Sequence, residues 1–337
     1  MIDFYKGKRV CVTGGSGLIG SYAVKLLKDA GVQVRAIIRT RRPTEFTRLA
    51  DQLVEVDLMD PRQAERAVRG CEIVIGCAGI TGGIGLAHLD PVSYVGPATV
   101  LACNTIHACY TEKVERYGFL SSTTVYPESG MAVAEGDEVC GPPFRLYEGI
   151  GESKRYLEKL ARYYHEKTGL KAAVVRPSGA YGRFDNFDES TSHVVPGLIN
   201  RALKGAYCSM CMTDGSPGNR CPHATGTFEL WGDGGDTRDF VHAEDVARGL
   251  LLATASGYTH AMPFNIASGR GVTTRELAET VLAAVGSRAE IVLRPDKPTA
   301  MRTRLVSIEK ARRLLGYEPT ISLADGIADV VKWRRSS

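Results

Sequence analysis

The sequence has no long apolar run. None of its hydrophobic stretches reaches the roughly 20 residues that a membrane-spanning helix needs. Residues 1–6 also lack the charged and then apolar pattern of a secretory signal. Lys and Arg form no extended basic run, and the net charge is a mild +4, which argues against a nucleic-acid binding stripe. We therefore expect a cytoplasmic protein without a membrane or nucleic-acid partner.

The sequence also lacks internal repeats and low-complexity tracts. Its 44% hydrophobic and 24% charged residues are ordinary for a globular protein, and 337 residues are enough for about two domains with a substantial core. In a cytoplasmic chain, nine cysteines are more typical of buried thiols than of a disulfide framework. These features argue against a fibrous or a disordered protein.

Short apolar strands alternate with amphipathic helices through the first half of the chain. The predicted strands cover residues 9–12, 32–38, 53–56, 72–77, 117–121 and 172–176, and the predicted helices cover residues 18–30, 61–68, 98–110 and 152–168. Such an alternation is typical of a parallel sheet with helices on both faces. Beyond residue 176, a stretch rich in Gly, Pro, Ser, Asn and Asp precedes two further predicted helices, 274–285 and 307–315.

A glycine-rich turn lies between the first predicted strand and the first predicted helix. Residues 13–20 read Thr-Gly-Gly-Ser-Gly-Leu-Ile-Gly, which places glycines where the turn is tight, where backbone must approach a pyrophosphate and where the helix packs on the strand. The phosphates would lie at the helix N-terminus, where free N–H groups and the helix dipole favour negative charge. The expected contacts of this nicotinamide dinucleotide site are Gly14, Ser16, Gly17, Leu18 and Ile19.

The end of the second predicted strand indicates which dinucleotide binds. An NAD site usually presents a carboxylate there to the ribose 2′-hydroxyl, whereas an NADP site presents Arg to the 2′-phosphate. This chain has Arg39, Arg41 and Arg42 and no carboxylate. NADP(H) is therefore the favoured coenzyme, with NAD(H) left open because the same arginines could form a solvated basic loop. Further predicted contacts follow the third and fourth strands: Asp57, Leu58, Cys77, Ala78 and Gly79.

These observations predict an α/β fold, a Rossmann-type doubly wound parallel sheet with a smaller mixed α/β substrate-binding cap. We assign residues 1–176 and 236–268 to the dinucleotide-binding Rossmann domain. Residues 177–235 and 269–337 form the predicted cap.

Several short motifs extend this pattern along the chain. They are residues 78–85 (AGITGGIG), 104–108 (NTIHA), 121–127 (SSTTVYP), 185–187 (DNF), 192–194 (SHV), 228–234 (FELWGDG), 238–242 (RDFVH) and 315–319 (LGYEP). With the glycine turn, they make the chain resemble the extended short-chain dehydrogenase/reductase family of nucleotide-sugar epimerases, dehydratases and reductases over almost its whole length. Within that family, the branch of GDP-fucose synthase and GDP-mannose 3,5-epimerase is the most similar.

The resemblance implies an epimerase or a keto-sugar reductase that acts on a nucleotide-activated sugar, GDP-linked in this branch. It also implies a homodimer built on the helices around Lys154. Arg238 and Arg302 would hold the substrate diphosphate, because guanidinium forks suit that task, although apart from the family each could be a surface arginine. The implied substrate contacts are Gly82, Ser122, Asn186, His193, Arg238 and Arg302.

The catalytic set that the resemblance implies is incomplete. The family uses a Ser or Thr, a Tyr that exchanges the sugar hydroxyl proton, and a Lys one helical turn later that lowers the Tyr pKa and holds the nicotinamide ribose. Ser122 and Lys154 occupy two of these positions, but Ile150 stands at the third. Tyr147 is the obvious substitute if the chain before Ile150 is not helical, because seven helical residues span roughly 10 Å rather than about 6 Å. Glu148 is a weaker candidate.

Three further positions bear on the chemistry. His193 matches the residue that exchanges protons with sugar carbons in GDP-fucose synthase, and an ordinary imidazole pKa near 6.5 suits that work. Thr124 replaces its partner cysteine and is too weak an acid to act alone, and Gly179 replaces an Asn that contacts phosphate. Three readings stay open: coenzyme-dependent redox or epimerisation, a non-redox epimerase or isomerase that uses His193, and a catalytically silent sugar-nucleotide or dinucleotide-binding protein.

One cysteine cluster lies in an insertion that the family does not need. Cys208, Cys211, Cys221 and His223 could complete a tetrahedral shell for a structural zinc ion. The alternative is a set of free thiols in a loop of the cap.

Overall fold

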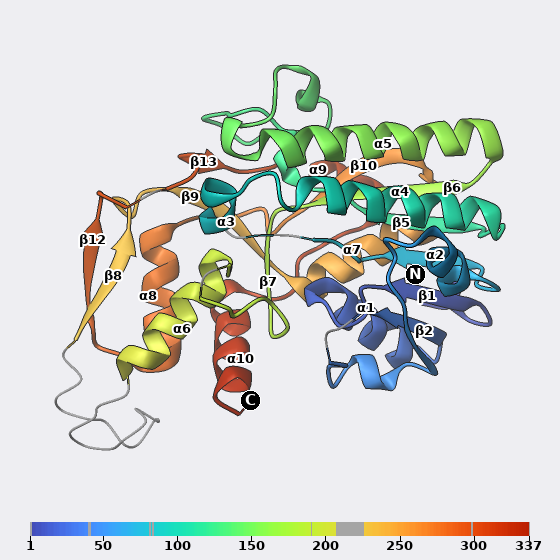
Figure 1. The fold of residues 1–337 in the computed structure, drawn as a ribbon. Helices are drawn as coiled ribbons and strands as arrows, with labels where there is room; N and C mark the ends of the chain where they lie inside the picture. The colour runs from blue at the N-terminus through green and yellow to red at the C-terminus, as the bar shows by residue number, and fades with distance from the viewer. Residues whose placement is uncertain are drawn as a thin grey trace.

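The computed structural model describes residues 2–39, 42–80, 82, 84–189, 191–206, 226–297 and 299–336. A parallel seven-stranded sheet forms the centre of this part of the chain, in the order β10-β6-β5-β4-β1-β2-β3 (Figure 1). Its strands are β1 (Arg9–Thr13), β2 (Gln33–Ile38), β3 (Gln52–Glu55), β4 (Ile73–Gly76), β5 (Arg116–Leu120), β6 (Lys171–Pro177) and β10 (His260–Ile266). The strand order reverses between β4 and β1, and open α/β sheets bind ligands at the carboxyl edge beside such a point.

Helices cover both faces of the sheet because its strands are apolar on both faces. In β1, Val10 and Val12 point into one hydrophobic core while Cys11 points into the other. The first core is covered by α1 (Leu18–Asp29) and α7 (Ala243–Ala255), and the second by α2 (Pro61–Val68), α4 (Val95–Thr111) and α5 (Glu148–Thr168) (Figure 1). The predicted doubly wound fold is confirmed, and β10 adds a seventh strand to the six that the sequence predicts.

A second group of elements packs beside the sheet around a third hydrophobic core. It includes the strands β7 (Gly179–Tyr181), β8 (Thr227–Trp231), β9 (Thr237–His242), β11 (Gly271–Thr273), β12 (Glu290–Arg294) and β13 (Thr303–Arg304). Its helices are α6 (Val194–Ala206), α8 (Thr274–Val285) and α10 (Leu323–Ser336). Strand β9 pairs with β7, β11 and β13 in a small sheet, and β8 pairs with β12.

Shorter helices connect these elements. They are α3 (Ile84–Leu89), α9 (Glu309–Leu315), and single 3₁₀ turns at Ile2–Tyr5, Thr47–Leu49, Thr123–Val125, Asp137–Val139 and Arg145–Tyr147. In the described ranges, no helix combines the length and the apolar character that crossing a membrane requires.

Arg183 joins the loop after β2 to the C-terminal helix. Its guanidinium forms two hydrogen bonds to Asp329 on α10, at 2.7 and 2.5 Å, and one to Glu45 at 2.9 Å. Four aromatic rings pack beside this contact with centroids 5.1–5.7 Å apart, from Tyr22, Phe46, Phe184 and Trp333. The second group of elements is therefore bonded to the segment that follows β2.

Candidate active site

The glycine turn after β1 is shaped by backbone contacts. Gly14 has a φ of +64°, which L side chains rarely adopt, and an added Cβ would lie 2.7 Å from the backbone of Ala78. A Cβ on Gly20 would overlap the carbonyl oxygen of Gly14. The Gly15 N–H donates to Ile37 O at 2.8 Å, which fixes the turn to β2. Only glycine fits at positions 14 and 20, where another part of the backbone comes this close.

The turn leads directly into α1, and the arrangement fits a pyrophosphate. Gly17 is the N-cap of α1 and provides no side-chain cap, and the first turn of the helix has no acidic residue. The first N–H groups of α1 thus face the turn without a side-chain partner, beside the positive end of the helix dipole. Ser16 is buried in the turn, and Leu18 and Ile19 pack against the core below it.

Other predicted coenzyme contacts follow the neighbouring strands. Ala78, after β4, donates its N–H to Thr13 Oγ1 at 3.2 Å and lies against Gly14. Cys77 and Gly79 flank it, and burial raises the pKa of the Cys77 thiol. These residues lie at the carboxyl edge of β1 and β4, where the strand order reverses.

The segment after β3 is held in place by Asn104. The Asn104 amide donates to Leu58 O at 3.0 Å and to Met59 O at 2.9 Å, and Leu58 is buried. Asp57 accepts a hydrogen bond from Met59 N at 3.0 Å. At the end of β2, Arg39 is exposed, whereas Arg41 lies outside the described residues.

The predicted serine lies just after β5. Ser122 is the N-cap of a 3₁₀ turn, and its Oγ accepts a hydrogen bond from Thr124 N at 3.1 Å. Thr124 Oγ1 is buried and has no hydrogen-bond partner among the described residues. A buried hydroxyl without a partner is uncommon, and a polar ligand would supply one.

Lys154 projects from α5 towards the same strand. Its Nζ donates to Leu120 O at 2.9 Å and lies 5.0 Å from the ring centroid of Phe119. Burial lowers the pKa of Lys154 to about 8, against the opposing charge of Glu158. The ammonium form predominates at neutral pH, but it releases its proton far more readily than an exposed lysine does.

The position of the family tyrosine lies inside α5. The helix begins at Glu148, so Ile150 stands one turn before Lys154 on a regular helix. The chain before Ile150 is therefore helical from Glu148, and Tyr147 is the N-cap, about two turns or roughly 10 Å along the axis from Lys154. This geometry does not meet the condition on which Tyr147 could replace the missing phenol beside Lys154. Glu148 is exposed.

His193 lies just ahead of α6 and is paired with a buried carboxylate. Its Nδ1 lies 3.0 Å from Asp185 Oδ1, and Asp185 is 4% exposed. Burial alone would lower the pKa of His193, but the hydrogen bond and charge of Asp185 raise it above the ordinary value. With Nδ1 engaged, Nε2 is the ring nitrogen left to exchange a proton with a ligand.

Asn186 and two glycines shape the wall beside this pair. The Asn186 amide donates to Thr191 Oγ1 at 2.8 Å and accepts from Asp188 N at 3.0 Å, so it stabilises its own loop. A Cβ on Gly179 would lie 2.9 Å from Asp239 O, so a side chain there would require the neighbouring backbone to shift. Gly82 packs closely against Leu86.

The two predicted diphosphate arginines share one carboxylate, because Arg238 Nη2 lies 3.5 Å and Arg302 Nη1 3.6 Å from Asp236. Arg302 is exposed, and its Nη1 also lies 2.7 Å from both carboxylate oxygens of Asp233. Arg304 is in register with Arg238 across β13 and β9. Arg304 Nη2 donates to Thr123 Oγ1 at 2.8 Å, and its guanidinium lies 5.2 Å from the ring centroid of Tyr147. Arg304 thus connects Arg238 to the serine segment.

The electrostatics of this arginine pair favour an anionic ligand. Burial lowers the pKa of Arg304, and burial together with the charge of Arg304 lowers that of Arg238 despite Asp236. Both guanidiniums stay charged, since arginine titrates far above neutral pH. Two half-buried cations side by side are stabilised by a bound anion.

Sequence reasoning missed both Arg304 and Arg201. The Arg201 guanidinium on α6 lies 5.7 Å from the ring centroid of Phe228 and 5.9 Å from that of Trp231. Both rings belong to β8. Arg304 begins to matter only once β13 (Thr303–Arg304) pairs with β9, which no local signal in the sequence marks. No local signal marks Arg201.

The predicted zinc ligands Cys208, Cys211, Cys221 and His223 lie outside the described residues, and the zinc site stays a prediction. Elsewhere in the described ranges, no three His, Cys, Asp or Glu side chains come together as a metal site would require.

The sequence matches the model of the NAD dependent epimerase/dehydratase family over residues 10–267, and a GDP-mannose 4,6 dehydratase model over residues 222–330. It is 28% identical to dTDP-4-dehydro-6-deoxy-D-allose reductase from a Streptomyces species, over 99% of this chain and 98% of the relative. It is also 28% identical to GDP-L-fucose synthase from Sinorhizobium fredii, over 96% of this chain and 94% of the relative. UDP-glucose 4-epimerase from Thermus thermophilus, solved with NAD, superposes with a TM-score of 0.77 at 26% identity, covering 98% of this chain and 99% of that chain.

The chain belongs to the NAD dependent epimerase/dehydratase family, whose model spans most of its length. Its relatives are nucleotide-sugar epimerases, dehydratases and reductases of the extended short-chain dehydrogenase/reductase type. The predicted family and enzyme class are confirmed. The preference for NADP(H), the GDP group and the roles of single residues stay predictions.

Proposed function

We propose that this protein is an NADP(H)-dependent enzyme that reduces a keto sugar, epimerises a sugar, or does both, on a GDP-linked substrate. The observation that carries the proposal is the pair of His193 and buried Asp185, with 3.0 Å between Nδ1 and Oδ1. A carboxylate that orients an imidazole and stabilises its charged form is a common arrangement for a proton donor.

The coenzyme proposal rests on the turn after β1 and the end of β2. Arg39 is exposed and forms no ion pair within the described part of the chain, so it is available to a 2′-phosphate. A bound nicotinamide would supply the hydride chemistry. Comparing the dissociation constants of NADPH and NADH tests the preference; equal affinities, or tighter NADH binding, contradict it.

The proposed substrate contacts are cationic. Arg238 and Arg304 form a charged pair beside Thr123, as a diphosphate requires. Arg201, between Phe228 and Trp231, offers a cation beside apolar rings where the nucleotide would end. The GDP group is favoured because the GDP-mannose 4,6 dehydratase model covers this region and relatives include GDP-L-fucose synthases.

Two groups can move a proton near neutral pH without the missing phenol. His193 exchanges it at Nε2, while its Nδ1 stays bonded to Asp185. Lys154 has a pKa of about 8 because it is buried, so its ammonium is a stronger acid than usual. Ser122 and the unpaired hydroxyl of Thr124 would hold the sugar hydroxyl or carbonyl in place.

The experiment is to incubate the purified protein with a panel of GDP-sugars and their keto forms, with NADPH or NADP⁺, and to follow nicotinamide absorbance and sugar products together. A product with an absorbance change supports reduction. A product without one supports epimerisation, including the non-redox reaction at His193. Coenzyme binding without any product across the panel would show a catalytically silent protein, the alternative that Ile150 motivates.

A substitution tests whether Ile150 limits the chemistry. Ile150→Tyr restores a phenol one helical turn before Lys154. We expect new or increased oxidoreductase turnover with the coenzyme affinity unchanged. Ile150→Phe is the matched control, since it has the ring without the hydroxyl. Equal turnover of the two variants contradicts the idea.

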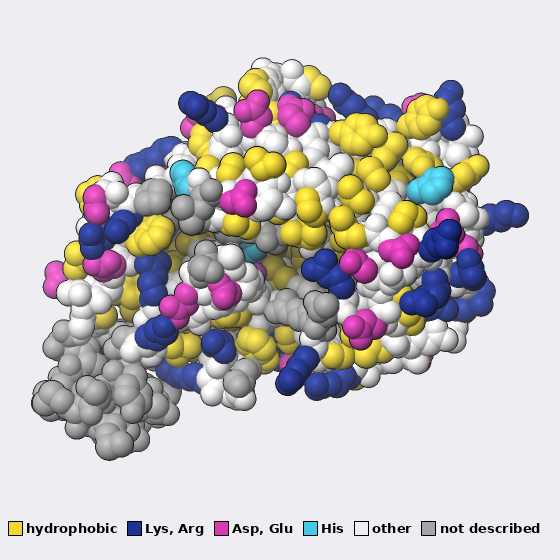
Figure 2. All heavy atoms as spheres, viewed as in Figure 1, with side chains coloured by type: hydrophobic (Ala, Val, Ile, Leu, Met, Phe, Trp, Pro, Cys, Tyr) yellow, Lys and Arg dark blue, Asp and Glu magenta, His cyan; other side chains and the backbone are white. Residues whose placement is uncertain are grey.

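The outer face of α4 and α5 fits a homodimer contact. Figure 2 shows hydrophobic side chains gathered over these helices. Val100, Tyr110, Tyr156 and Tyr163 are 44%, 48%, 53% and 58% exposed. Large exposed apolar groups at this density mark an association surface. Sedimentation should find a dimer, and Tyr163→Glu should shift it to monomers; a wild-type monomer at micromolar concentration contradicts the proposal.

A further inference from the structure

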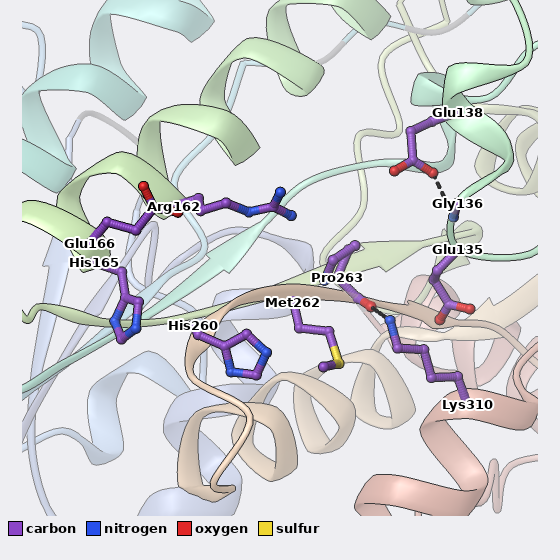
Figure 3. Close-up of a pocket in the computed structure, with 10 residues that line it drawn as sticks. All are labelled: Glu135, Gly136, Glu138, Arg162, His165, Glu166, His260, Met262, Pro263 and Lys310. Carbon is purple, nitrogen blue, oxygen red and sulfur yellow. Dashed lines mark hydrogen bonds between the residues drawn. The ribbon is translucent and has the colours of Figure 1, made fainter.

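A cavity opens at the β10 edge of the sheet, with β6, β5 and β4 between it and β1. Its volume is about 550 Å³, a size that suits a small metabolite. Figure 3 shows the residues that line it, which come from α5, from the start of β10, from the segment around the 3₁₀ turn Asp137–Val139 and from α9. They are Glu135, Gly136, Glu138, Arg162, His165, Glu166, His260, Met262, Pro263 and Lys310.

One wall of the cavity carries an arginine and two imidazoles. Arg162 and His165 come from the last turns of α5, and His260 begins β10. The two imidazole centroids are 6.4 Å apart. Arg162 extends from α5 over the cavity (Figure 3) and forms no ion pair within the described ranges, although Glu166 lies one turn away on the same helix. A guanidinium without a partner is therefore presented to the cavity.

The charges on the opposite wall are already bonded. Glu138 accepts from Gly136 N at 2.8 Å and from Arg176 at 3.0 Å. Glu135 accepts from Asn265 N at 2.7 Å, and Lys310 donates to Pro263 O at 2.8 Å. On the α5 and β10 wall, His165 Nδ1 donates to Leu170 O at 3.1 Å and Glu166 contributes a carboxylate, so Arg162 and His260 are the side-chain donors left for a ligand.

We propose that this cavity is a second ligand site, which binds an oxyanion of the phosphate-ester or carboxylate class through Arg162 and His260. A guanidinium fork matches the geometry of either oxyanion. Met262 and Pro263 give the floor an apolar surface for the organic part of such a ligand.

A chain of hydrogen-bonded charged side chains connects the wall of the cavity to the candidate active site. Glu138 on its wall contacts Arg176, which is fully buried and binds Glu158 through Nε at 2.9 Å and Nη2 at 2.5 Å. Glu158 accepts from Ser121, next to Ser122, and stands one helical turn after Lys154. Ligand binding in the cavity should therefore alter coenzyme affinity, a consequence that rests on the proposed role of Lys154.

Isothermal titration with inorganic phosphate and, separately, with citrate tests the site and distinguishes its two ligand classes. The glycine turn and the Arg238–Arg304 pair also attract oxyanions, so a variant must identify the cavity. Arg162→Gln should weaken one class of binding by about tenfold or more, since charge-assisted hydrogen bonds are lost. Lys159→Gln, an exposed position on the same helix outside the cavity, should leave it unchanged. Identical titrations of wild type and Arg162→Gln would overturn the proposal.

The connection is tested by measuring NADPH affinity with and without saturating phosphate. Direct competition at the glycine turn persists in Arg162→Gln, so the difference between wild type and variant reports the connection alone. By reciprocity, coenzyme must change the phosphate affinity of the cavity by the same factor. If phosphate changes the NADPH affinity of wild type and of Arg162→Gln by the same factor, the connection is refuted. A failure of NADPH to bind at all counts against the proposed coenzyme but not against the cavity site.

Discussion

The coenzyme turn and the acid–base segment lie at the same carboxyl edge of the sheet but are built differently. The turn after β1 is defined by backbone: Gly14 has a positive φ and touches Ala78, so another residue cannot enter without moving the chain. The segment ahead of Lys154 is defined by side chains on a regular helix. Ile150 therefore stands where the family resemblance predicts a phenol, without disturbing the fold.

Coenzyme binding and proton transfer can therefore change separately. A protein of this fold can keep its dinucleotide pocket while its proton donor is exchanged, because helix propensity and packing do not require a hydroxyl at Ile150. The donor can then come from another element, such as His193 ahead of α6. Four substitutions test how separate the two are.

His193→Asn should have the largest effect. Loss of a positioned general acid typically lowers turnover by about 10²–10⁴-fold. Coenzyme affinity should stay the same, because His193 lies on the cap side and not at the turn. Steady-state kinetics with the active GDP-sugar and fluorescence titration with NADPH measure both. A parallel fall in NADPH affinity would show that the two regions do not act separately.

Gly14→Ala should reduce NADPH affinity by about 100-fold, because the new Cβ forces the turn away from Ala78 and a displacement of about 1 Å has effects of that order. Gly7→Ala is the matched control: its φ of +74° is similar, but an added Cβ meets nothing within 4 Å. Both variants should lower the free energy of unfolding by about 1–2 kcal/mol each through backbone strain, and thereby lower Tm. Only Gly14→Ala should lose the coenzyme, and equal affinities of the two would refute the steric account.

The fold could be predicted from the sequence where local signals decide it. The strand, glycine turn and helix at residues 9–29 are all marked by neighbouring residues, and the structure agrees to within a residue or two. The sequence predicts that α5 starts at residue 152, but the helix begins at Glu148. Gly149 and Gly151 disfavour a helix locally, yet Gly151 packs so closely on Thr124 O and Pro143 that a side chain there would clash. Tertiary contact overrides propensity at this point.

In the candidate site, too, local sequence signals predict some features and tertiary contacts decide the others. The serine, lysine and histidine positions follow from motifs along the chain. The partners of those residues do not, because they depend on which strands pair and which loops meet. Arg304 faces Arg238 only through the pairing of β13 with β9, and Asp185 meets His193 across the seven residues between them.

Arg304→Gln should raise KM for the nucleotide sugar by about tenfold, since a charge-assisted hydrogen bond to the diphosphate would be lost. Arg302→Gln should change it by about twofold or less, because that arginine is an exposed ion-pair partner of Asp233. In both variants kcat should change less than KM. If Arg302→Gln has the larger effect, the diphosphate lies at the outer rim and not beside Thr123.

Of the four substitutions, Asp185→Asn should have the smallest effect on turnover, but it should clearly change the pH dependence of turnover. Asp185 raises the pKa of His193 above its ordinary value, so its neutralisation leaves burial to lower that pKa. The acidic form of His193 then persists only to a lower pH, and the pH at which turnover falls should move down. Nuclear magnetic resonance titration of the imidazole in wild type and Asp185→Asn checks the direction. A pKa that stays in place or rises would show that Asp185 does not control His193.

The contact of Arg183 with Glu45 and Asp329 has a consequence for redesign of the coenzyme preference. Replacing Arg39 alone changes a charge at the end of β2. Transplanting the whole following loop from an NAD-specific relative would also remove Glu45, which positions the Arg183 that binds α10, and Phe46, which packs on the Phe184 ring beside Trp333. Such a graft should therefore loosen the C-terminal helix, so a chimera needs a compatible α10 from the same donor.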